Sequence, residues 1–153
     1  MALKGDRVEH LTDISFFMSA STAERGYIVV HDTGGSGAAM DDGNALVKLP
    51  TAGISGTKPA GLLLNDVVNL DLTRQHYNMH KDEVQLGGKV TLLRRGTVVT
   101  NAISGTPTIG AQAYYNNNGQ LSATNFQSNS TQVGRFLSLL DADGYCKVEI
   151  NIV

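Results

Sequence analysis

The chain has 153 residues and a mass of 16.3 kDa, and its 12 basic and 14 acidic residues give a formal net charge of −2. This length favours one domain with a core of its own, and so small a charge provides no basic field for nucleic acid or anionic lipid. No apolar run approaches the ~20 residues of a membrane-spanning helix. We therefore expect a globular domain with no nucleic-acid or membrane partner.

Composition favours β-structure. Glycine is frequent, with 17 residues, tryptophan is absent, and charged residues make up only 17% of the chain. Asparagine, serine and threonine are also plentiful. Because these residues and glycine supply turns, the composition is typical of an all-β protein with many turns.

The N-terminal segment, residues 1–25, differs from the rest of the chain. Charged residues come first, an apolar group follows, and small polar residues come last. One interpretation is a strand or irregular segment packed on its own domain. The other is an extended N-terminal arm that docks its apolar group on a neighbouring subunit or partner, leaving residues 26–153 as a single β domain. A disordered segment is disfavoured because it would leave two phenylalanine side chains exposed to water, which is unfavourable in free energy. The predicted partner-binding residues are Ile14, Phe16, Phe17 and Met18.

The same segment lacks the features of a secretory signal. Lys4, Asp6, Arg7 and Glu9 interrupt it, and the apolar group is too short for the hydrophobic region of a signal peptide. We therefore expect synthesis in the cytosol.

The middle of the chain contains short apolar runs. Gly26–Val30 is predicted to be a strand, and Leu62–Leu64 reads as a strand buried on both faces, or as one bent at Gly61. These leucines, with Val98 and Val99, exceed what one thin sheet must bury. This excess suggests a subunit interface.

No catalytic, cofactor or metal site is predicted. His76 and His80 are four residues apart and could share a metal on a helix, but no helix signal flanks them and no third ligand follows at a recognisable spacing. An exposed loop or strand edge is the favoured interpretation. The single cysteine, Cys146, is predicted to be a small buried hydrophobic residue rather than a reactive thiol. We therefore predict that the protein is not an enzyme.

The C-terminal part, Lys89–Val153, carries the clearest pattern. From Cys146 to Val153 apolar and polar residues alternate, which indicates a strand with one buried face and one wet face. Turn signals separate the preceding runs, and we predict an antiparallel meander of short strands in a small β-barrel or sandwich. The predicted turns are Arg94-Arg95-Gly96, Asn116–Gly119 and Asp141–Gly144.

From Gly87 onward the order of short motifs is similar to that of a known family. The motifs are Gly88-Lys89-Val90, Gly96-Thr97-Val98, Ile109-Gly110 with Tyr114-Tyr115, a turn at Gly119, a polar span, Gln132–Leu137, and a last strand with Val148 and Ile150. This order resembles the capsid decoration, or cement, proteins of tailed bacteriophages. The first half of the chain matches only as β-rich sequence.

The resemblance implies a non-enzymatic structural virion protein with a small β-barrel or sandwich fold. It also implies a homotrimer that binds the major capsid protein on the outer surface of the capsid and stabilises the shell. One alternative is a carbohydrate- or receptor-binding β module of a phage tail or cell surface, and another is a small hydrolase that uses His76 and His80. The residues that would serve the carbohydrate-binding alternative are Tyr27, Tyr77, Tyr114, Tyr115 and Tyr145.

Overall fold

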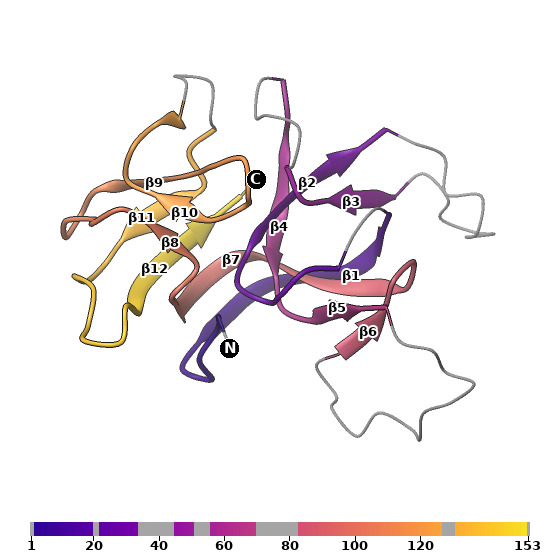
Figure 1. Cartoon of the computed structure of the whole chain (residues 1–153), viewed down its shortest axis with the longest axis horizontal. Coiled ribbons are helices and arrows are strands. Elements are labelled where there is room, and N and C mark those ends of the chain that lie inside the picture. The colour runs from indigo at the N-terminus through magenta and orange to yellow at the C-terminus, as the bar shows by residue number, and fades with distance from the viewer. Residues whose placement is uncertain are drawn as a thin grey trace.

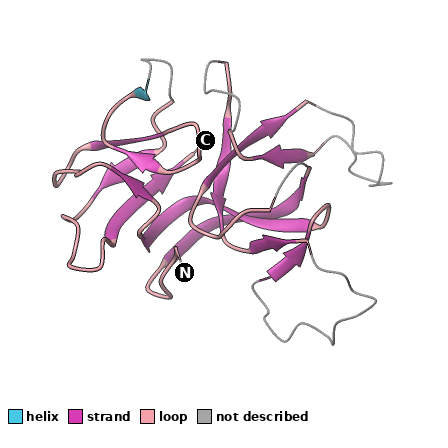
Figure 2. Ribbon diagram, viewed as in Figure 1, coloured by secondary structure: helices cyan, strands magenta, loops and turns pink. Residues whose placement is uncertain are grey.

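The structure, a computed structural model, describes residues 2–19, 22–33, 45–50, 56–69, 83–126 and 131–152. Within these residues the chain forms strands and no α-helix, and the short cyan piece in Figure 2 is a single 3₁₀ position at Phe126, so the predicted all-β fold class is confirmed. The strands are β1 (Val8–Met18), β2 (Ile28–Asp32), β3 (Leu46–Lys48), β4 (Pro59–Leu63), β5 (Asp66–Val68), β6 (Glu83–Gln85), β7 (Lys89–Thr100), β8 (Ile103–Ser104), β9 (Gln112–Tyr115), β10 (Leu121–Ser122), β11 (Gly134–Phe136) and β12 (Cys146–Asn151).

Ten of these strands form one sheet, in the order β1-β3-β2-β4-β7-β12-β11-β9-β10-β8, and β5 and β6 form a separate pair. The long strand β7 joins the two halves of this sheet (Figure 1). One edge of β7 pairs with β1, and the other edge pairs first with β4 and then with β12. A circuit of pairings therefore runs through β1, β3, β2, β4 and β7, which makes this half barrel-like, although β1–β3 and β4–β7 are each joined by only two residue pairs.

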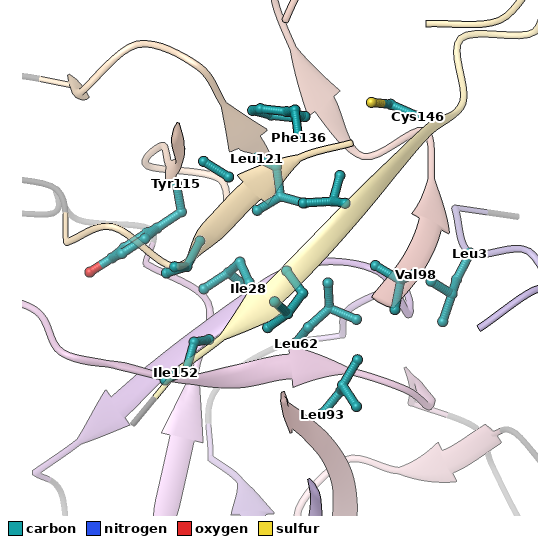
Figure 3. Close-up of a cluster of buried hydrophobic side chains, with 14 of the residues drawn as sticks. Leu3, Ile28, Leu62, Leu93, Val98, Tyr115, Leu121, Phe136, Cys146 and Ile152 are labelled. Carbon is teal, nitrogen blue, oxygen red and sulfur yellow. The ribbon is translucent and has the colours of Figure 1, made fainter. Parts of the chain in front are cut away.

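Two hydrophobic cores lie on opposite faces of β4 and β7. One core, shown in Figure 3, includes Leu62, Leu93 and Val98 and packs against residues of β9 to β12. The other includes Leu63 and Leu92 and lies on the side of β1, β3 and β5. Consecutive residues of a strand point to opposite faces, so Leu62 and Leu63 serve different cores.

The prediction of a strand buried on both faces is confirmed for Leu62 and Leu63, which lie in β4, and Leu64 directly follows the strand. All three leucines are at most 4% exposed. Because these leucines are covered within the chain, they do not support the predicted subunit interface, which stays a prediction. Val98 is buried in the first core as well. The two cores of the chain account for Leu62–Leu64 and Val98, whereas Val99 is partly exposed and belongs to neither core.

The turn predicted at Arg94-Arg95-Gly96 is also wrong, because β7 continues through these residues without interruption. Glycine is needed there for a different reason. A Cβ atom at Gly96 would lie 2.1 Å from the carbonyl oxygen of Val8, where β1 runs against β7. The glycine thus permits close approach of two backbones rather than a reversal of the chain.

The C-terminal strand and the other two predicted turns are confirmed. In β12 buried and exposed residues alternate without exception, and Cys146 is 1% exposed, as expected of a small buried hydrophobic residue. Asn116 and Asp141 each accept two backbone N–H groups of their own turns through Oδ1. The strands do not follow one another as a meander, however. The last strand, β12, lies between β7 and β11, and the pairs β1–β3, β5–β6 and β8–β10 are parallel.

The N-terminal segment is a strand of the main sheet in this structure. Strand β1 pairs with β7, and Leu3 and Ala23 bridge to Thr100 and Val67. Of the two interpretations of residues 1–25, the strand packed on its own domain describes the isolated chain. Burial of Met18 and partial burial of Phe16 against the second core give the physical reason. Docking of this segment on a neighbour stays a prediction about an assembled state.

Replacement of Gly134 by alanine tests how closely β11 approaches β12. A Cβ atom there would lie 1.8 Å from the carbonyl oxygen of Glu149, whereas a Cβ atom at Gly5 would have no neighbour within 4 Å. Neither glycine has a positive φ, so left-handed backbone strain does not distinguish the two variants. We expect Gly134→Ala to lower the free energy of unfolding by about 1–3 kcal/mol or more and Gly5→Ala to change it by less than about 0.5 kcal/mol. Denaturant titrations measure both, and equal effects would contradict the packing shown.

A second prediction concerns acid. The backbone N–H of Tyr145, followed by that of Asp143 and by Lys4, holds the pKa of Asp141 below the usual 3.8. A carboxyl with a lowered folded-state pKa stabilises the fold above its unfolded pKa and loses this contribution as the pH falls through the folded value. The stability advantage of the wild type over Asp141→Asn should therefore shrink between pH 6 and pH 3. Denaturation midpoints at the two pH values measure it, and an advantage that is the same at both would refute this role.

Candidate functional site

The four predicted partner-binding residues differ in exposure. Ile14 is 67% exposed, whereas Met18 is fully buried in the second core. The ring of Phe16 is 5.4 Å from that of His31 on β2, and the amine of Lys89 lies 5.4 Å from the centre of the Phe17 ring. Of this group, only Ile14 is left largely in solvent.

Strand β1 is nevertheless the least covered long element of the described chain. Its residues from Val8 to Thr12 are exposed, and Val8 and Leu11 are each 50% exposed. On the edge away from β7, only Phe17 and Met18 pair with another strand, so the preceding part of β1 has no strand partner among the described residues. Edge strands that expose backbone and apolar side chains are ready contacts for another protein.

The pairing of β1 with β7 is irregular. Its register shifts at three places, between Glu9 and Leu11, between Leu11 and Thr12, and between Asp13 and Phe16. At the third shift, the backbone N–H and the hydroxyl of Ser15 both donate to Oδ1 of Asp13. The hydroxyl bond is the main reason that the pKa of Asp13 lies below its usual value. Bulges of this kind interrupt a strand edge and limit indiscriminate pairing with other strands.

A broad exposed surface lies beside β1, on the face of the sheet opposite to the first core. Thr97 lies between buried Gly96 and Val98, and it therefore points away from the core. Paired residues share a face, so the register places Val8, Thr97, Glu149, Arg135 and Gln112 in one row across β1, β7, β12, β11 and β9. We call this surface the outer sheet face; it comprises Val8, Leu11, Arg95, Thr97, Val99, Gln112, Arg135, Lys147, Glu149 and Asn151.

The outer sheet face is basic. Arg95, Arg135 and Lys147 are exposed on it, and Glu149 is its one acidic residue. Within the described part of the chain none of these four side chains takes part in an ion pair. Since the whole chain has 12 basic and 14 acidic residues, this positive surface belongs to a protein that is acidic elsewhere.

The other chemical possibilities find no support in the described residues. Tyr115 is buried in the first core, where burial raises the pKa of its hydroxyl, and Tyr27, Tyr114 and Tyr145 are partly buried, so they form no exposed aromatic platform. Tyr77 and the pair His76 and His80 lie outside the described residues. No cluster of three potential metal-ligating residues occurs in the described ranges. Nor is any described helix long and apolar enough to span a bilayer.

Sequence reasoning found only part of this site. The alternation in β12 marks Lys147, Glu149 and Asn151 as the wet side of a strand. It does not indicate that Arg95 and Arg135 lie beside them, because that depends on the register between strands distant in sequence. The predicted turn at Arg94-Arg95-Gly96 hid the fact that Arg95 is an exposed residue of β7.

Comparison with known families supplies the identity. A family model described as "structural cement protein (E217 gp24/Pam3 gp6)" matches residues 9–151, which run from the second residue of β1 to the last residue of β12. A search of curated proteins found no match. The matched region contains nearly all of the sheet, including all but one residue of β1 and both halves joined by β7. The chain therefore belongs to the phage structural cement protein family.

Proposed function

We propose that this protein is a non-enzymatic head decoration protein that binds the outer surface of the major capsid shell and stabilises it. The observation that carries this proposal is the family match, which covers residues 9–151 and describes a structural cement protein of phage. The proposed location is the outside of the virion, after synthesis in the host cytoplasm. Its non-enzymatic character rests on the structural role that the family description gives.

The fold suits such a role. A protein that holds a shell together requires a stiff body, because flexible segments lose conformational entropy on binding. Two packed cores share β4 and β7, so the two halves of the sheet are held together through buried leucines and backbone pairing. Partly uncovered β1 and the adjacent sheet face then provide contact area without any pocket.

Stabilisation of a shell follows from binding by many copies. A protein that binds assembled subunits and not separated ones lowers the free energy of the assembled state. Contacts that are weak one by one add up when a copy touches more than one subunit, because the second contact is made at high effective concentration.

A homotrimer is the oligomeric state that we expect from the resemblance. The buried leucines of β4 do not support it, since they are covered within the chain. Light scattering behind a sizing column provides the test, and a mass of three times 16.3 kDa that persists on dilution is the expected result. A monomer would exclude a stable trimer in solution and leave assembly on the capsid.

The proposed function itself is tested on heads of the phage that encodes the chain, prepared without this protein. Added protein should sediment with the heads and raise the temperature at which they release their DNA. Heads that neither bind the protein nor gain stability would refute the proposal.

The contact made by β1 is tested in the same assay with two isoleucines of equal exposure. Ile14 on β1 is 67% exposed and Ile109, before β9, is 66% exposed. Burial of an isoleucine side chain contributes about 1.5–3 kcal/mol, so we expect Ile14→Asp to weaken binding to heads by about tenfold or more. Ile109→Asp is the control. If both variants bind heads equally well, Ile14 is not part of the contact with the shell.

A further inference from the structure

We propose that the outer sheet face is the side of the protein that lies on the shell, and that it docks on an acidic patch of the major capsid protein. This inference rests on the proposed function and assigns the binding surface and the chemistry of its partner.

The first argument is geometric. The outer sheet face extends across β1, β7, β12, β11 and β9. Strand β12 lies in the middle, with β7 and β1 to one side of it and β11 and β9 to the other, as the strand order and Figure 1 show. Strands about 4.8 Å apart make this face roughly 19 Å wide, and its three rows of side chains make it roughly 13 Å long. Its core side is filled by buried residues such as Val98 and Val148. A face supported in this way is a stiff platform whose charged groups keep their spacing.

The second argument is the distribution of charge. Three of the chain's 12 basic residues lie on this face, against one of its 14 acidic residues, so the remaining chain has nine basic and thirteen acidic residues. Arg95, Arg135 and Lys147 have no ion-pair partner in the described part of the chain. Electrostatic complementarity orients a protein on its partner and excludes other orientations. An acidic surface is therefore attracted by this face and repelled by the rest of the molecule.

The third argument concerns the edge of the face. Val8 and Leu11 are each 50% exposed, and their paired residues Thr97 and Arg95 place them on the same side as the cations. Apolar residues next to unpaired charges are typical of a protein contact, in which apolar burial provides affinity and charge provides orientation. Exposure of Val8 and Leu11 does not contribute to solubility, so a role of this face in solubility alone does not explain them.

A second copy of the chain is a poorer occupant. Two identical basic faces placed against each other would bring arginines and lysines of like charge together, which opposes association. The flat projection of the face, about 19 by 13 Å, is also well below the ~800 Å² per partner of a standard stable interface. A shell offers the missing area through further contacts of the same copy, such as those of β1.

The test uses charge reversals of opposite sign and heads that lack the protein. Arg135→Glu and Glu149→Lys change paired neighbours on β11 and β12. Lys58→Glu, at an exposed position directly before β4, is the matched control for Arg135→Glu. Co-sedimentation at low and at moderate salt measures the affinity of each variant, and denaturant titration verifies that each is folded.

We expect Arg135→Glu to weaken binding at least fivefold at low salt and Glu149→Lys to strengthen it, while Lys58→Glu has little effect. Added salt should reduce all of these differences. Damage to the fold cannot produce the gain in affinity expected of Glu149→Lys.

This inference would be overturned if Arg135→Glu strengthened binding and Glu149→Lys weakened it, or if neither variant changed binding more than Lys58→Glu does. The proposed function would stand in both cases, provided that the wild type binds heads. Binding that is lost when Lys58 is reversed and kept when Arg135 is reversed would place the shell on another side of the molecule. Failure of the wild type to bind heads would overturn the proposed function and this inference together.

Discussion

The pairing of β7 along both of its edges is the constraint on which the rest of this structure depends. One edge is occupied by β1, and the other is shared between β4 and β12. Because β4 and β12 pair with different parts of the same strand, the sheet divides into two halves that cannot separate without breaking β7 pairing. The first core packs β2 and β4 of one half against β9 to β12 of the other, and the second core lies within the first half. Leu92 and Leu93 contribute to opposite cores.

In this arrangement the strands differ in how many of their edges pair with a neighbouring strand. Strands β4, β7 and β12 have neighbours on both edges, whereas most of β1 is paired on one edge only. Local stability follows buried contacts and backbone pairing, so the body of the domain is expected to outlast its N-terminal strand under stress. The segment with most to gain from a partner is thus the one next to the basic outer sheet face.

A decoration protein and an enzyme place different demands on a fold. Catalysis requires groups that converge in a protected site, whereas a protein that stabilises a shell requires area, stiffness and repeated attachment. The residues that distinguish this chain's surface are spread over five strands and have ordinary chemistry. The order of short motifs from Gly87 onward resembled the cement family, and the match over residues 9–151 confirms that resemblance.

The sequence alone determined the all-β class, the resemblance to the cement family and several local features. Alternation in Cys146–Asn151, the turns at Asn116–Gly119 and Asp141–Gly144, and double burial of Leu62–Leu64 each follow from a few neighbouring residues. The tertiary structure decided what depends on residues distant in sequence. It makes Gly96 a point of close approach to Val8 rather than a turn, and it brings Arg95, Arg135 and Lys147 onto one face. Strand order and register depend on which cores the strands can fill together, and no single segment contains that information.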